Sequence, residues 1–190
     1  MWKHVRLGFL AGMLITMGCV AFLKLGGLPG AAVFSAGLWF VLFTGAELFT
    51  GRVTSPDYSI GDKLLMLVYN DLGALCTGLL VSLSLPGLRE TAMEVTQGYL
   101  AAPWWALLCR SFMCGVCMYL AVQKLTDKGH LPNVVYGVIL FIVSGYAHSI
   151  AIAGYAAVAM DVNGLWLVPL CAAGNALGSY AVKALATGRL

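Results

Sequence analysis

Six apolar stretches, each long enough to cross a lipid bilayer, take up most of this 190-residue chain. A transmembrane helix needs about 20 mostly apolar residues. Only 10% of the residues are charged, and a chain this short cannot bury so much apolar surface in a water-facing globule. The pattern predicts an all-α membrane protein with six transmembrane helices in a single domain, residues 1–190. The predicted spans are Leu7–Leu23, Leu28–Phe49, Leu64–Leu85, Ala101–Leu125, Val134–Ala159 and Leu165–Ala186.

Lysine and arginine residues are distributed unevenly between the two sides of the predicted membrane. If both termini face the cytoplasm, the outer loops contain only Lys24 and Arg89. The cytoplasmic side then contains Lys3, Arg6, Arg52, Lys63, Lys124, Lys128, Lys183 and Arg189. Because cytoplasmic segments of membrane proteins carry an excess of lysine and arginine, we expect a multi-pass protein of the cell (inner or plasma) membrane with both termini in the cytoplasm.

Few polar side chains lie within the predicted spans, and each is a candidate for function because polar groups are costly at membrane depth. They are Glu47, Thr50, Asn70, Asp71, Arg110, His148, Ser149 and Asn175. The alternative for any of them is a hydrogen bond between helices. We expect structural roles for Glu47, Asn70 and Arg110, with Arg110 paired to Glu47 or Asp71 or else steering a substrate. Glu47 could also accept bonds from backbone amides.

The two halves of the sequence resemble each other. Gly45–Gly51 at the end of the second span is matched 100 residues later by Gly145–Ile150 in the fifth. Asn70–Gly73 in the third span is matched 105 residues later by Asn175–Gly178 in the sixth. Because each half has three spans, the halves would lie in opposite orientations, which is typical of an inverted repeat with a site near the midplane. The predicted halves are roughly residues 1–98 and 99–190.

Two segments, Gly45–Gly51 and Ser144–Ala151, are predicted breaks in the second and fifth helices. Each places glycine and a polar side chain where an apolar helix should continue. Backbone groups freed at membrane depth must be satisfied by protein or by a water-filled cavity. The amino ends of half-helices offer partial positive charge to an anion. Two breaks at matched positions therefore favour a pore or transporter for a small anion.

These segments also carry a family resemblance. The run Leu42–Gly51 resembles the second-span signature of the formate/nitrite transporter family, and Phe141–Ala151 resembles its fifth-span signature. Leu120–Val122 and Gly174–Gly178 are similar to its fourth- and sixth-span motifs. The resemblance extends from the second span to the sixth, with the motifs in the same order.

The resemblance implies a homopentamer in membrane lipid, in which each six-span protomer has an aquaporin-like fold and its own pore. The implied substrate is a small monovalent anion of a weak acid, of the formate, nitrite or hydrosulfide class. By motif, Thr50 and His148 face the pore, and we assign Ser149 and Asn175 to the same substrate or pore site. The motif positions of the apolar constrictions are Leu48, Phe49 and Phe141.

Three positions depart from the usual family pattern. Ala147 stands where Glu is usual, and Ile152 and Gly115 stand where Asn is usual. These departures thin the polar ring around His148, so they concern the substrate more than the fold. We expect the His148 ring to hold the anion by a charge-assisted hydrogen bond or to give it a proton. Thr50 would share the substrate or orient the ring.

The sequence is also compatible with three other functions. A neutral-solute channel of aquaporin-like architecture shares the repeat, but the paired Asn-Pro-Ala signature is absent from the sequence. A redox or metal enzyme could use Cys114, Cys117 and His148, although no second histidine lies within a predicted span. A structural or sensing protein is the third possibility. We expect no enzymatic activity, cofactor, metal or nucleic-acid partner.

Overall fold

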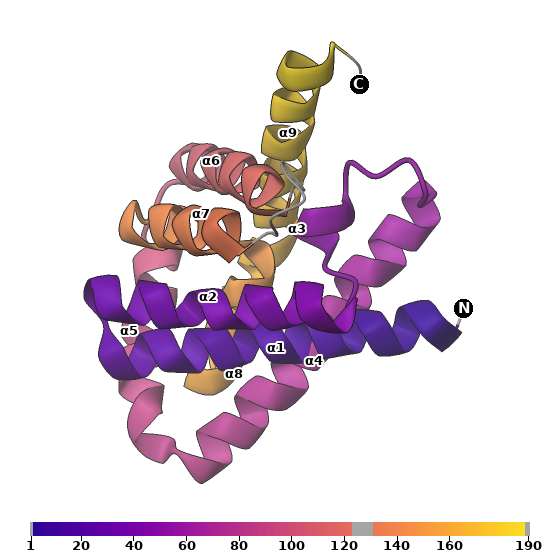
Figure 1. Cartoon of the computed structure of the whole chain (residues 1–190). Helices are drawn as coiled ribbons and strands as arrows, with labels where there is room; N and C mark the ends of the chain where they lie inside the picture. The colour runs from indigo at the N-terminus through magenta and orange to yellow at the C-terminus, as the bar shows by residue number, and fades with distance from the viewer. Residues whose placement is uncertain (1, 123–130, 189–190) are drawn as a thin grey trace.

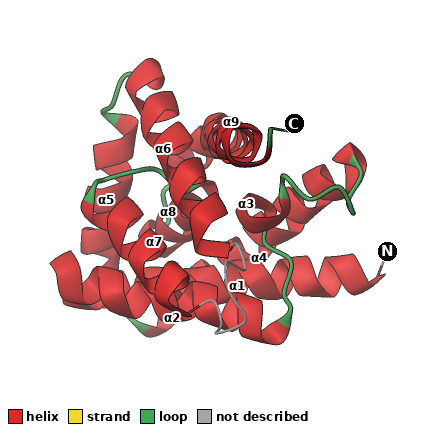
Figure 2. Ribbon diagram, turned by 45° about the horizontal axis from the view of Figure 1, so that its top comes forward, coloured by secondary structure: helices red, strands yellow, loops and turns green. Residues whose placement is uncertain are grey.

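The computed structural model describes residues 2–122 and 131–188, and this part of the chain contains helices and loops but no strand (Figures 1 and 2). Lys124, Leu125, Lys128 and Arg189, which entered the predictions above, lie outside the described residues. The elements in chain order are α1 (Trp2–Leu25), α2 (Gly27–Thr44), α3 (Phe49–Arg52), α4 (Ile60–Ser84), η1 (Pro86–Leu88), α5 (Arg89–Leu100), α6 (Trp104–Val122), α7 (Leu131–Val143), α8 (Ser149–Ala159), η2 (Val162–Leu167) and α9 (Val168–Thr187).

The described chain has the spans of a multi-pass membrane protein. Five helical segments are long and apolar enough to cross a membrane: His4–Leu25, Gly27–Thr44, Ile60–Ser84, Trp104–Val122 and Val162–Thr187. The first two lie side by side and antiparallel as α1 and α2 (Figure 1). The predicted fifth span is divided between two shorter apolar helices, α7 and α8.

Two helix pairs, α1 with α4 and α6 with α9, pack with their backbones in close contact. A Cβ atom on Gly12 in α1 would overlap the carbonyl oxygen of Asn70 in α4. A Cβ atom on Gly115 in α6 would likewise overlap the carbonyl oxygen of Asn175 in α9. Glycine permits this approach between membrane helices. Gly115, where the family resemblance leads us to expect Asn, therefore has no room for any side chain.

The second and fifth helices are broken as predicted. Helix α2 ends at Thr44, and Gly45 follows in the left-handed conformation with φ of 68°. Helix α7 ends at Val143, and Gly145 has the same φ of 68°. Glycine adopts this conformation without the strain that a side chain would cause, so it ends each helix. The chain then runs on in extended form to the first residue of the next helix, Phe49 or Ser149.

The second half-helices differ in length and burial. All eleven residues of α8 are buried, and the helix packs against α1, α4, α5 and α9. A short helix that is apolar on every face fits such a site. Helix α3 has only four residues and continues into a loop that leads to α4. The first break is open to a cavity, whereas the second leads into the core of the chain.

Candidate functional site

The two breaks meet at a hydrogen bond between Thr50 and His148. Thr50 Oγ1 lies 2.9 Å from His148 Nε2, although the residues are 98 positions apart in the chain. Thr50 is 1% exposed and His148 is 2% exposed. Thr50 is the second residue of α3, and His148 is the residue that caps the amino end of α8. The fold thus brings together the two side chains that the sequence analysis assigned to the pore.

The cap fixes which nitrogen of His148 carries hydrogen in the neutral ring. The amide of Ala151 donates to His148 Nδ1 at 3.1 Å. Because a backbone amide can only donate, Nδ1 is the acceptor and the ring hydrogen is on Nε2. The Nε2–H group therefore donates to Thr50 Oγ1, and the hydroxyl hydrogen of Thr50 is free to donate in turn.

Two asparagine side chains hold the backbone of the breaks in the same way. Asn70 Oδ1 accepts the amide of Phe49 at 2.7 Å, and its Nδ2 donates to the carbonyls of Gly8 and Glu47 at 2.8 Å. Asn70 is completely buried. All three of its described bonds go to the backbone, so it supports the first break.

Asn175 makes the matching contacts at the second break. Its Oδ1 accepts the amide of Ser149 at 3.0 Å, and its Nδ2 donates to the carbonyls of Ser111 and Ala147 at 2.8 and 2.9 Å. The structure therefore places Asn175, which the sequence analysis assigned to the pore, in the backbone support of the break. Ser149 lies beside the pair, and its buried Oγ has no hydrogen-bond partner among the described residues.

Apolar side chains surround the polar pair. The Phe141 ring stacks on the His148 imidazole with 5.8 Å between ring centroids, and Phe34 meets Phe141 edge-on at 5.7 Å. Leu48, directly before α3, is 2% exposed and lines a cavity. Phe49 packs in a different cluster, formed with Val53, Met66 and Ala172. Leu48 and Phe141 thus belong to the apolar side chains around the Thr50–His148 pair. Phe49 instead packs between α4 and α9.

Glu47 has partners that the sequence analysis did not identify. Its carboxylate accepts a hydrogen bond from the Tyr58 hydroxyl at 3.2 Å and lies 2.7 Å from His4 Nδ1. Burial and the Glu47 carboxylate raise the pKa of Tyr58, so Tyr58 donates as a neutral phenol. Pairing with Arg110, one of the alternatives that the sequence left open for Glu47, is not formed among the described residues, because the Arg110 side chain is exposed. Only the Arg110 carbonyl supports the site, by accepting the amide of Ala147 at 3.4 Å.

The cavity beside Leu48 has a volume of about 520 Å³ and is open to solvent. It lies where α2, α3, the following loop, α6 and α9 come together. Its lining is Leu38, Val41, Leu42, Ala46, Leu48, Gly51, Arg52, Thr54, Ser55, Pro56, Tyr119, Val122 and Lys183. We call this cavity the α3-side vestibule. From the sequence, Arg52 and Lys183 are recognisable only as cytoplasmic charges, because nothing in the linear pattern indicates that they share one cavity.

The buried thiols do not assemble a metal site within the described part of the chain. Cys114 and Cys117 are buried and unpaired, and no three His, Cys, Asp or Glu side chains there are grouped to hold a metal ion.

The family model described as "Formate/nitrite transporter" matches residues 1–187. The chain belongs to the formate/nitrite transporter family. Among curated proteins, this formate/nitrite transporter family member is similar to "Uncharacterized transporter YrhG" of Bacillus subtilis (strain 168), with 28% identity over 76% of this chain. It spans 66% of the length of that relative.

Solved structures show the same fold. A "Pentameric formate channel with formate bound" matches with a TM-score of 0.82 and 20% identity, covering 97% of this family member and 94% of that chain. An "FNT family ion channel" matches with a TM-score of 0.85 and 21% identity, covering 97% and 88%. The family and these relatives are described as transporters or channels rather than enzymes.

Proposed function

We propose that this protein passes a small monovalent anion of a weak acid, of the formate, nitrite or hydrosulfide class, across the cell membrane. The observation that carries the proposal is the buried Thr50–His148 pair, which joins two helix breaks inside an apolar shell. Family membership supports the transport class. The pentameric formate channel with the same fold supports a homopentamer, and because the junction lies within one chain, each protomer would have its own pore.

His148 acts in this proposal as a neutral donor through Thr50. Its Nε2–H donates to Thr50 Oγ1, so the free hydroxyl hydrogen of Thr50 donates to the anion, and a hydrogen bond to a charged acceptor is stronger than one between neutral groups. Protonation of the ring at Nδ1 would break the bond from the Ala151 amide. Any proton transfer at the ring is therefore coupled to loss of the α8 cap, and binding of the anion needs no such step.

The apolar shell selects what passes. Moving a full charge past Leu48 or Phe141 without hydrogen-bond partners costs several kcal/mol or more, and moving the neutral acid costs far less. An anion that takes up a proton from the solvent that reaches the α3-side vestibule can therefore cross the shell as the neutral weak acid, and His148 stays neutral. A strong-acid anion such as chloride has no such form and should pass poorly.

We also infer that α7 and α8 together make a sixth crossing, and that the halves form an inverted repeat around the junction. The matched glycine turns and asparagine bonds support this arrangement. The excess of lysine and arginine at both ends of the chain supports termini in the cytoplasm. The α3-side vestibule would then open to the cytoplasm.

Flux into liposomes containing the purified protein tests the proposal. Formate, nitrite, hydrosulfide and chloride would be presented separately at several pH values, beside the His148→Phe variant. Flux of a weak-acid anion that rises with acidity and is lost in a folded His148→Phe variant is the expected result. Flux of glycerol or urea, without any anion flux, would instead identify a neutral-solute channel.

A further inference from the structure

Asp71 is an ionisable residue at membrane depth that the proposed function does not use. It lies near the middle of α4, one of the five helical segments long and apolar enough to cross a membrane. Val68 and Leu72 on the same helix are exposed, so the surface beside Asp71 is apolar. Ionisable groups inside a membrane are costly, and such a residue is therefore a candidate for function.

The Asp71 carboxyl group has no partner among the described residues. Its Oδ1 is buried and accepts no hydrogen bond, and the ion pair found in this part of the chain joins His4 to Glu47. Pairing of Asp71 with Arg110, which the sequence left open, is not formed there either. Burial of an unpaired carboxylate costs far more than burial of the neutral acid. The position is therefore suited to a group that binds a proton.

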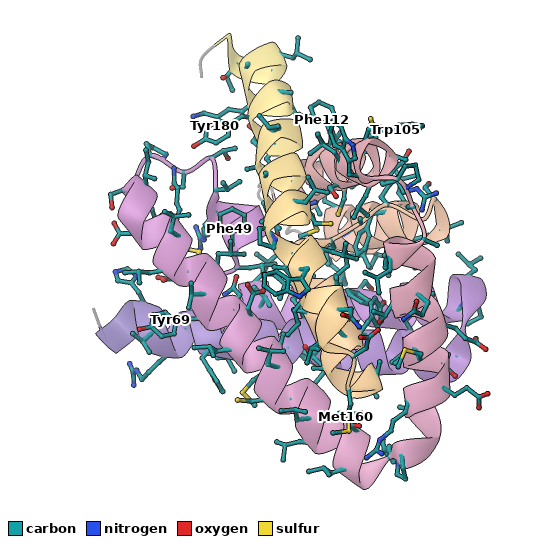
Figure 3. The ribbon with its side chains drawn as sticks, turned by 180° about the vertical axis from the view of Figure 1, so that it is seen from behind. Phe49, Tyr69, Trp105, Phe112, Met160 and Tyr180 are labelled. Carbon is teal, nitrogen blue, oxygen red and sulfur yellow. The ribbon has the colours of Figure 1, made fainter. Side chains whose placement is uncertain are left out.

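Asp71 is adjacent to the support of the first break. The preceding residue, Asn70, accepts the amide of Phe49 at 2.7 Å, and Thr50 follows Phe49 in the chain. Phe49, labelled in Figure 3, packs between α4 and α9. Neighbouring residues lie a few Å apart, so the Asp71 carboxyl group is roughly 10 Å from the Thr50 hydroxyl. The charge state of Asp71 can therefore act on an anion at the junction.

Helix packing places Asp71 at the level of the second break as well. Gly78 of α4 packs against Ala157 of α8. Figure 3 shows α8 ending at Met160 on the side of the molecule where α4 also ends, so the two helices run in the same direction. About two helical turns before this contact, α4 reaches Asp71 and α8 reaches Ser149. The Ser149 hydroxyl is also buried and without a partner among the described residues, so two such oxygens lie at this level.

No neighbouring charge is placed to cancel that of Asp71 within the described chain. Helix α4 packs against α1, α3, α8 and η1. The titratable side chains described on these elements are His4, Arg6, Cys19 and Lys24 of α1, Arg52 of α3, and Tyr155 of α8 with His148 at its cap. None of them is bonded to Asp71. Within α4, Asp62 belongs to the capping box and Lys63 donates to Tyr180.

We propose that Asp71 is a proton-binding residue that makes anion binding at the Thr50–His148 junction dependent on acid. This inference rests on the proposed function and adds a second source of pH dependence to it. Ionised Asp71 repels an anion at Thr50, and a proton taken from solvent removes that repulsion without passing to the anion or to His148. One charge about 10 Å away, at intermediate polarity, weakens anion binding roughly tenfold. The matched position 105 residues later is Ala176, so the effect comes from one half.

The experiment compares Asp71→Asn with wild type and with Glu94→Gln. Asparagine keeps the shape of the side chain without its charge, and Glu94 is the control because it is an exposed acid on α5. Initial formate flux is measured against formate concentration from acid to alkaline pH. At alkaline pH we expect the KM of Asp71→Asn to be roughly tenfold below that of wild type. At acid pH, where both side chains are neutral, the two KM values should agree, and Glu94→Gln should follow wild type throughout.

A second readout does not depend on flux. Infrared spectroscopy detects the carbonyl stretch of a protonated carboxyl group, and ¹³C-labelled aspartate assigns it in wild type even if the variant fails to fold. We expect an aspartic-acid band that disappears on alkaline titration, persists in Glu94→Gln and is absent from Asp71→Asn. If wild type shows this band but passes no anion, the proton-binding site stands and the proposed function fails. Absence of the band at every pH, or equal KM profiles in wild type and a folded Asp71→Asn, would overturn the inference even if the wild type transports formate.

Discussion

The two helix breaks have the same backbone and different side chains. Gly45 and Gly145 share a φ of 68°, and Leu48 and His148 are both extended, with φ of −96° and −97°. At each break a buried asparagine accepts the amide of the first residue of the half-helix and donates to two carbonyls. The backbone of the junction thus follows from glycines and asparagines that the two halves have in common.

The side chains on this shared backbone differ between the two halves. Glu47, Thr50 and Arg52 of the first half correspond by position to Ala147, Ile150 and Ile152 of the second. The first half therefore supplies the hydroxyl, the buried carboxylate and a vestibule charge, and the second supplies the imidazole and an apolar helix. Both halves support the backbone in the same way, but they carry different functional side chains. Substitutions at matched positions can therefore distinguish the effect of backbone support from the effect of the side chains.

The largest effect is expected from removing the asparagine support. Asn70→Leu and Asn175→Leu each leave one buried amide and two buried carbonyls without their partner. A buried unsatisfied polar group costs about 1–3 kcal/mol, so each variant should lose roughly 3 kcal/mol or more of unfolding free energy. Unfolding of the purified proteins in detergent measures this loss. A large loss in one variant and almost none in the other would show that the breaks are not equivalent.

At the matched positions 50 and 150, loss of the side-chain group should reduce anion flux only at Thr50. Thr50→Val removes the hydroxyl that accepts from His148. A hydrogen bond to a charged group contributes about 1.5–3 kcal/mol, so anion flux should fall roughly 10- to 100-fold. Ile150→Val at the matched position is the control and should keep flux within about twofold. Equal losses in liposome flux from the two variants would mean that packing, and not the hydroxyl, matters at this position.

The sequence predicted the parts of this site that depend on local pattern. The breaks are visible as glycine next to polar residues in apolar runs, and the matched spacing identifies the halves. The partners of Glu47 and the vestibule charges could not be predicted in this way. They depend on how the loop after α3 turns, which brings Tyr58 to His4 and Thr54 to Lys183.

Packing explains one departure from the family pattern, at Gly115, for which the sequence alone gives no reason. Gly115 was expected to thin the polar ring, but its position lies against the carbonyl of Asn175. A side chain there would push α6 away from α9 and disturb the support of the second break. The sequence left Arg110 either pairing through its side chain or steering a substrate, whereas its carbonyl makes the described contact with the break. Both details depend on helix distance and rotation, which a hydropathy pattern does not contain.

A smaller effect is expected from the turns themselves. Gly45→Ala and Gly145→Ala place a side chain at φ of 68°, and among the described residues the added Cβ would meet nothing within 4 Å apart from its own chain neighbours. The cost is therefore backbone strain alone, about 1–2 kcal/mol for each variant. Unfolding in detergent should give the same loss for the two within about 0.5 kcal/mol, the level at which independent sites usually agree. A clear difference between them would show that one turn is strained by contacts beyond its own backbone.

The smallest effect should come from the ion pair of the first half. His4 lies 2.7 Å from the Glu47 carboxylate, but its side chain is 42% exposed, so water and salt weaken the interaction. A double-mutant cycle with His4→Gln and Glu47→Gln should give a coupling of about 0.2–1 kcal/mol. The parallel cycle of Arg110→Gln with Glu47→Gln should give no coupling, because the two side chains are not partners. Coupling of Glu47 to Arg110 that exceeds its coupling to His4 would restore the pairing expected from the sequence. It would also mean that Arg110 of the second half interacts with Glu47 of the first.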